Sequence, residues 1–364
     1  MITLLGVAIS VLIRLKNVTE EPSTRLPTEL KDGIVAIYTT TILMAKAPLP
    51  HHTLVSTQYV FVSIVLIFRI QTILNDFIAT YVTRDDFTTI ILPTIEKGLL
   101  RSPENCLLGT SLLPSSCILS DNIFSAVTQY FLAYKHPLEP SSFQRLLTQV
   151  INSSKSSSPV VRTNSVALFQ ALLTLNDPED PHNLSRLAVS DLLALPKTGK
   201  TAGPDHRVAL YLMLSFLPPS DGVSATLIQT STPLLAKEPH EGATAVLAAA
   251  LPPHIDFLLR ESSLSSETTQ LIAKEMSNSK PAVRKAFVGL AGSVFFNGQG
   301  TLETEKGVAF ANALLPSFEA CLKTVASNPL NSSGGPYEGY VAISVLLGPF
   351  AQSKKFGQCI SVRI

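Results

Sequence analysis

A Gly-Lys-Thr triplet at residues 199–201 is the first candidate for chemistry, because the same triplet binds phosphate in nucleotide-binding loops. Those loops carry a second glycine five positions earlier and follow a β-strand. Ala194 stands at that earlier position, and residues 184–195 have the spacing of a helix. We therefore predict a surface loop here and no nucleotide site.

The histidines and cysteines do not form a metal-binding pattern. His51-His52 has no third ligand at helical spacing, and His240-Glu241 lacks the second histidine of a zinc-protease helix because Thr244 stands in its place. No Cys-x-x-Cys pair occurs among the four cysteines, Cys106, Cys117, Cys321 and Cys359. We predict buried free thiols in a reducing compartment, no metal, no cofactor and no catalytic site.

The loop around the triplet is basic and offers a different kind of chemistry. Lys197, Lys200 and Arg207 lie close together in the sequence, beside His206. Such a cluster could contact RNA phosphates or a protein partner, and the alternative is an ordinary solvated loop. The formal net charge of +1 gives the whole chain no general attraction to nucleic acid.

The elements that must hold these residues read as helices entered through prolines. Residues 277–294 contain Pro281, with Arg284 three positions later, and residues 156–173 repeat this arrangement with Pro159 and Arg162. In the first stretch, apolar residues at steps of three and four form one stripe: Val283, Ala286, Phe287, Leu290, Ala291 and Val294.

The spacing of the arginines predicts a repeat architecture. Arg162 and Arg284 stand 122 positions apart, about three times the length of a HEAT repeat, and Arg207 follows Arg162 by 45. We predict an all-α fold, an α-solenoid of about seven to nine HEAT-like (armadillo-like) helical hairpins. Pro159, Arg162, Pro281 and Arg284 are interpreted as its structural repeat signature, each guanidinium bonding to a neighbouring repeat; direct ligand contact is the alternative.

We expect one continuous array over residues 1–364, with divergent N-terminal helices over 1–80 and better-defined repeats over 83–350. Neither end has the polar outer face of a capping repeat, so we expect a fragment of a longer solenoid. The apolar run at 1–13 lacks the basic start of a signal peptide, and the run from 59 reaches membrane length only by taking in Arg69. Both are interpreted as buried helices.

Residues 83–100 form a second clear helix pattern. Thr83 and Asp86 approximate an N-terminal capping box, and Pro93 lies inside the apolar stripe, which predicts a kink there. The following sequence carries a resemblance: DDFTTIILPTIEKGLLRSPE, at 85–104, resembles the N-terminal region of the general control nonderepressible protein 1 family. Residues 75–87, 280–292 and 337–347 resemble the same family in the same order. The resemblance covers roughly 54–347 and is weaker over 117–202.

This resemblance implies a function that composition and spacing do not. The family consists of very large HEAT-repeat translational activators, so it implies a cytosolic, ribosome-associated, non-catalytic scaffold. Such a scaffold supports activation of the initiation-factor-2-alpha kinase in the amino-acid starvation response. The implied partners are the ribosome, together with an ABC-type ATPase and the kinase, which would bind through family regions absent from this sequence. No membrane or small-molecule substrate is implied. The alternative is a generic HEAT-repeat adaptor, a transport or phosphatase scaffold without a ribosome role.

Overall fold

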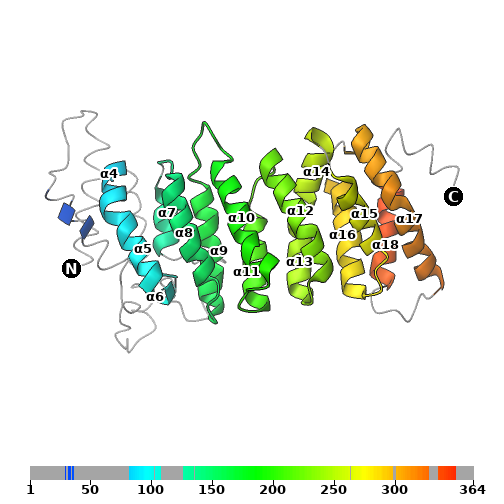
Figure 1. Ribbon diagram of the computed structural model, residues 1–364, viewed down its shortest axis with the longest axis horizontal. Helices are drawn as coiled ribbons and strands as arrows, with labels where there is room; N and C mark the ends of the chain where they lie inside the picture. Colours follow the sequence, from blue (N-terminus) through cyan, green and yellow to red (C-terminus); the bar gives the residue numbers. More distant parts are fainter. Residues whose placement is uncertain are drawn as a thin grey trace, which may run out of the picture. The chain divides into compact units, whose positions relative to one another are not determined.

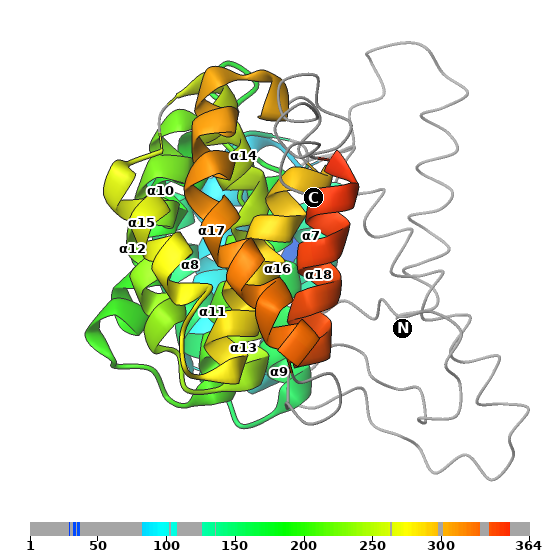
Figure 2. The same cartoon turned by 90° about the vertical axis from the view of Figure 1, so that its right-hand side faces the viewer.

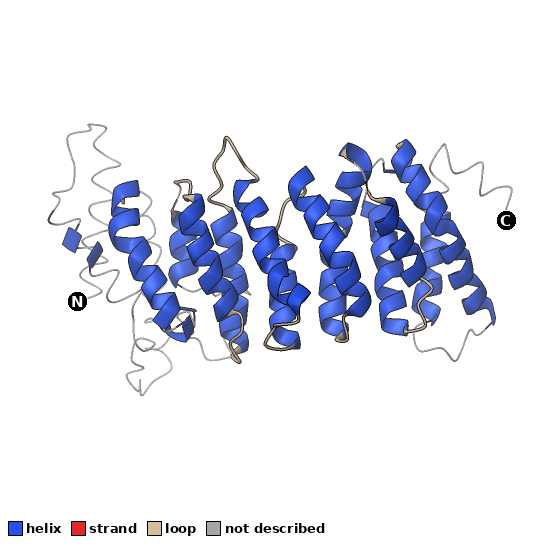
Figure 3. Ribbon diagram, viewed as in Figure 1, coloured by secondary structure: helices blue, strands red, loops and turns tan. Residues whose placement is uncertain are grey.

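The computed structural model describes residues 82–101, 103–107, 126–134, 136–262, 264–297, 301–327 and 335–349, with a few residues between 29 and 36. Over these ranges the chain consists of helices and their connections, with no strand (Figures 1 and 3). A single isolated bridge joins Asp177 and Asp180 within a turn. The predicted all-α solenoid fold is confirmed.

The chain divides into two compact units, one ending at Leu184 and the other beginning at Ser185. In the first unit, α8 and α9 form an antiparallel hairpin, α5 packs against α8, and α7 packs against α9, so the helices form two layers. The elements of this unit are α4 (Arg84–Asp86), the π-helical turn η2 (Phe87–Ile91), α5 (Leu92–Arg101), α6 (Pro103–Leu107), α7 (Ala126–Ala133), α8 (Pro140–Ser153) and α9 (Pro159–Leu173).

The start of the first unit shows how local sequence sets the helix. The predicted capping box is present: Thr83 Oγ1 accepts a hydrogen bond from the Asp86 amide at 3.2 Å, and the Thr83 amide donates to Asp86 Oδ2 at 3.0 Å. Pro93 has no N–H to donate and crowds the preceding turn. The π-helical turn η2 lies directly before it, at the place where the sequence predicts a kink.

The second unit repeats the two-layer arrangement over a longer stretch. Helices α11, α13, α16 and α18 pack one after another in one layer, while α12, α15 and α17 do so in the other. Figure 2 shows α17 and α18 side by side. The elements of this unit are α10 (Asn183–Thr198, which begins at the boundary), α11 (Pro204–Leu214), α12 (Asp221–Lys237), α13 (Glu241–Ala250), α14 (Pro252–Glu261), α15 (Ser266–Glu275), α16 (Pro281–Asn297), the 3₁₀ turn η3 (Thr301–Glu303), α17 (Glu305–Ser327) and α18 (Gly335–Leu347).

The predicted apolar stripe forms the core of the second unit. On α16, Val283, Phe287, Leu290 and Val294 are buried, because their spacing places them on the face that meets α13, α14 and α18. Burial of each such side chain contributes roughly 1.5–3 kcal/mol to folding. The core is therefore distributed along the stack rather than gathered at one centre.

One stretch of the described residues, Glu241–Glu261, is long and apolar enough to cross a membrane by length and composition. It comprises α13 and α14, and 67% of its most apolar window is buried inside the unit. Pro252 and Pro253 interrupt it, and Asp256 and Arg260 lie in its second half. This stretch is a core element of the helix stack.

Cys106 and Cys321 are buried thiols outside any disulfide, as predicted. Burial raises the pKa of the Cys106 thiol to about 11, so this thiol stays protonated and unreactive at neutral pH. Cys117, Cys359 and His51-His52 lie outside the described residues, as do nearly all of the residues expected to form divergent N-terminal helices (1–80). The single continuous array over 1–364 stays a prediction.

Candidate partner-binding groove

The signature arginines stabilise the turns through which their own helices are entered. Arg162 Nη1 donates to the carbonyls of Ser156 and Ser157, each at 2.9 Å. Arg284 Nη1 donates to the carbonyl of Asn278 at 2.8 Å. These bonds lie within the turn before each arginine's own helix, and the expected bond to a neighbouring repeat stays a prediction for Arg162 and Arg284. Their matched geometry supports the structural reading of Pro159–Arg162 and Pro281–Arg284.

The structure adds a third member to this signature. Pro204 opens α11 and Arg207 follows three positions later, as in the other two helices. Arg207 Nε donates to Glu238 Oε2 at 2.9 Å and Oε1 at 3.1 Å, and its Nη2 donates to Oε1 at 2.8 Å. Glu238 lies between α12 and α13. Arg207 therefore makes the bond to a neighbouring hairpin that we had expected of the other arginines.

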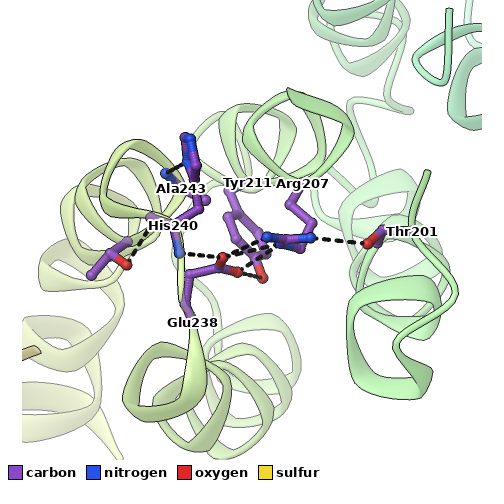
Figure 4. Close-up of polar contacts among 7 residues, drawn as sticks. Thr201, Arg207, Tyr211, Glu238, His240 and Ala243 are labelled. Carbon is purple, nitrogen blue, oxygen red and sulfur yellow. Dashed lines mark hydrogen bonds and ion pairs between the residues drawn. The ribbon is translucent and has the colours of Figure 1, made fainter. Parts of the chain in front are cut away.

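The Glu238 carboxylate collects donors from several elements (Figure 4). Besides Arg207, the Tyr211 hydroxyl donates to Oε2 at 3.2 Å and the His240 amide donates to Oε1 at 3.1 Å. The Glu238 side chain is only 3% exposed and that of Arg207 is 19% exposed. Burial, followed by the negative charge of Glu238, raises the pKa of Tyr211. The Arg207 guanidinium is bonded to Glu238 in this network, so Arg207 is unsuited to hold an external phosphate.

The Gly-Lys-Thr triplet caps a helix instead of forming a phosphate loop. Helix α10 continues to Thr198, so Lys197 lies on this helix and not in the loop predicted around the triplet. Gly199 adopts a left-handed conformation (φ +69°) that ends the helix. The Gly199 amide donates to the Pro196 carbonyl at 3.2 Å, and the Lys200 amide donates to the Leu195 carbonyl at 3.1 Å. The Gly199 and Lys200 amides are therefore not available to a phosphate.

The end of this helix nevertheless borders an open groove of about 750 Å³ in the second unit. The groove runs from the C-terminal end of α10 across Arg207 and Tyr211 to the C-terminal half of α12. Lys197 and Lys237 lie on its walls and are both exposed, while Lys200 is not among the lining residues. The structure thus brings together Lys197 and Arg207, two of the three predicted contact residues, at one groove.

Sequence reasoning missed Lys237 and Glu238 at this site. They lie 40 and 31 positions from Lys197 and Arg207, respectively, and approach them only because the folded unit brings the C-terminal end of α12 beside α10 and α11. The recurrence of proline and arginine at a spacing of three could have assigned Arg207 to the signature. No comparable local pattern marks its partner carboxylate.

Comparison with known families adds a finding for this part of the chain. Residues 204–362 match the family described as general control nonderepressible 1 (Gcn1) N-terminal. This part of the chain is therefore similar to the N-terminal region of Gcn1 proteins. The Gcn1 match contains Arg207, Tyr211, Lys237, Glu238 and the signature Pro281–Arg284.

The family match confirms the resemblance over residues 204–347. The resemblance of residues 54–203, including the segment at 85–104, stays a prediction because the Gcn1 match begins at 204. No curated protein and no solved structure matches the chain. The chain is therefore Gcn1-like over the region that contains most of the groove.

Proposed function

We propose that this protein is a non-catalytic HEAT-repeat scaffold of translational control. The observation that carries the proposal is the Gcn1 N-terminal family match over residues 204–362. A cytoplasmic location and association with the ribosome are part of the proposal, and the similarity to that family supports them. Support for activation of the initiation-factor-2-alpha kinase during amino-acid starvation also belongs to the proposal, as does cooperation with an ABC-type ATPase partner.

The stacked hairpins suit such a role physically. Each hairpin adds a limited contact surface, and its packing on the next sets the distance between partners bound along the stack. Within the second unit, the Arg207–Glu238 network links one hairpin to the next and fixes their relative position. A scaffold works through such fixed spacing and needs no catalytic residue.

The test is sedimentation of the tagged chain through a sucrose gradient of cell extract, with and without amino-acid starvation. We expect co-migration with ribosomes and polysomes that is lost when salt is raised, because ribosome contacts are largely electrostatic. The control is the same extract treated to dissociate ribosomes into subunits. In this extract the protein should sediment with the subunits. Protein that stays at the top of every gradient contradicts ribosome association by this chain.

The second candidate is a generic HEAT-repeat adaptor, and the groove favours it in one respect. Its walls carry Lys197 and Lys237 beside several prolines, which suits a short protein segment better than a long RNA backbone. An adaptor of this kind would retain protein partners from extract freed of ribosomes. The gradient experiment separates it from the ribosome-bound scaffold.

A further inference from the structure

We propose that the groove between the end of α10 and the C-terminal half of α12 binds an extended acidic segment of a protein partner. Side-chain carboxylates of this segment would pair with Lys197 and Lys237. Its apolar side chains would rest on the prolines and leucine of the walls. The proposal concerns a direct protein contact and does not depend on ribosome association.

The lining of the groove suits a peptide chain. Its apolar surface comes from prolines and one leucine, and its hydrogen-bonding groups come from threonines and Gln229. Pro233 has no N–H to donate to the Gln229 carbonyl four residues earlier in α12, so this carbonyl lacks its usual helical donor. The apolar lining residues are Pro196, Pro233, Leu234 and Pro239.

The charge of the groove comes from its lysines. The Glu238 carboxylate on the floor is balanced by Arg207 and accepts further hydrogen bonds, so the pair contributes no net charge. Neither Lys197 nor Lys237 takes part in an ion pair within the part of the chain that the structure describes. The groove therefore presents two uncompensated positive charges to a partner.

Both lysines also lie in the last turn of a helix, where a cation offsets the helix dipole. The C-terminal end of a helix carries the equivalent of about half a negative charge, which is less than the unit charge of each lysine. The walls thus remain attractive to carboxylates. A role in helix stability alone would not make the groove prefer an acidic peptide over a neutral one, which gives a direct test.

A single-stranded RNA fits the groove less well. RNA-binding grooves usually combine a continuous basic track with exposed aromatic rings on which bases stack. Among the described residues that line this groove, Tyr211 is the one aromatic; it is 1% exposed and its hydroxyl faces Glu238. The guanidinium of Arg207 is engaged with the same carboxylate. These features favour a peptide.

The experiment uses the purified full chain and fluorescence anisotropy at low salt. The probe is a labelled peptide of about twelve residues in which glutamates alternate with leucine and proline, compared with the same peptide carrying glutamine for glutamate. We expect the acidic peptide to bind about tenfold more tightly than the neutral one. The double variant Lys197→Glu, Lys237→Glu should lose about tenfold in affinity for the acidic peptide.

The matched control is Lys274→Glu, Lys280→Glu, which makes the same charge change at two exposed lysines outside the groove. It should bind the acidic peptide like the unaltered chain, and circular dichroism should show both double variants to be equally helical. Equal losses in the two variants, or no preference for glutamate over glutamine, would overturn the proposal. So would tighter binding of an oligouridine probe with the same dependence on Lys197 and Lys237, which would assign the groove to RNA.

Discussion

Arg207 shows how one side chain can hold a junction between two hairpins. It lies on α11, its acceptor Glu238 lies between α12 and α13, and the carboxylate is almost fully buried. Taking a charge out of water is costly unless its partner and further hydrogen bonds compensate. The junction is therefore sensitive to the loss of either partner.

We expect Arg207→Ala to lower the free energy of unfolding by about 3 kcal/mol, because it leaves the Glu238 charge buried without its cation. Urea unfolding followed by circular dichroism measures the change. Lys200→Ala, which removes an exposed cation a few residues away, should change it by about 0.5 kcal/mol or less. Adding Glu238→Gln to Arg207→Ala should recover part of the loss. Equal stability of the Arg207 and Lys200 variants would contradict the importance of this pair.

His254 gives a pH dependence to the same unit. Its ring is buried, and Nδ1 lies 3.0 Å from the Ser224 hydroxyl. Burial lowers the pKa of His254 to about 4, against a smaller opposing effect of a hydrogen bond with the Leu217 backbone. The unfolded chain therefore binds a proton at higher pH than the folded chain does.

The His254 contribution to stability is complete above about pH 6.5 and is lost as the pH falls toward about 4, by at most about 3 kcal/mol. Urea unfolding at several pH values measures the loss. Other carboxyl groups titrate in the same range, so the comparison is with His254→Asn, whose stability should fall less steeply with acid. Parallel pH profiles for the two proteins would show that His254 does not contribute.

At the scale of elements, glycines mark where helices and turns approach closely. A Cβ on Gly307, in the first turn of α17, would lie 1.8 Å from the carbonyl oxygen of Thr301 in η3. A Cβ on Gly222, near the start of α12, would meet only the Arg186 side chain at 4.0 Å. Alanine is a better helix former than glycine. A change to alanine at both positions therefore separates the effect of helix propensity from the effect of close packing.

We expect Gly307→Ala to destabilise the chain, because the backbone of η3 or α17 must move to relieve the contact. Gly222→Ala should be neutral or stabilising by up to about 1 kcal/mol. Thermal unfolding of the two variants beside the unaltered chain measures the difference. A Gly307 variant as stable as the Gly222 variant would show that the turn before α17 adjusts freely.

Patterns within single helices could be predicted from the sequence because they depend on neighbouring residues. The capping box at Thr83, the entry of α16 at Pro281 and the buried stripe that includes Leu290 are of this kind. The continuation of α10 through Lys197 depended on how the helix is capped at Gly199, which we had read as part of a loop. The sequence predicted a kink at Pro93, but it did not predict that the turn before this proline would be π-helical.

At the scale of the whole molecule, the candidate groove could be predicted only in part. Its basic loop was visible in the sequence, whereas Lys237 and Pro233 on α12 and Glu238 after it meet the loop only in the folded unit. Spacing along the chain does not record which side chains meet across such a packing. The bonds of Arg162 and Arg284 to their own entry turns were likewise not anticipated from spacing.

Because the core is distributed along the stack, a core substitution should destabilise mainly the helices around it. Leu290 is 1% exposed in the core of the second unit, and truncating such a leucine costs about 2–5 kcal/mol. Because each helical pair contacts mainly its neighbours, we expect Leu290→Ala to raise amide hydrogen exchange in α13, α16 and α18, and to leave α8 and α9 largely unchanged. Hydrogen exchange with mass spectrometry measures this. Uniform loss of protection along the chain would mean that it unfolds as one cooperative body.

The buried Glu238 carboxylate also has a mechanical consequence. Apolar contacts between stacked helices can slide and yield gradually, whereas short hydrogen bonds to a single carboxylate lose most of their strength over a small displacement. Glu238 receives such bonds from Arg207 and Tyr211 on α11 and from His240 at the start of α13. If the stack is stretched or bent, we expect this junction to act as a stiff link between more compliant ones, which resists small loads and then gives way abruptly.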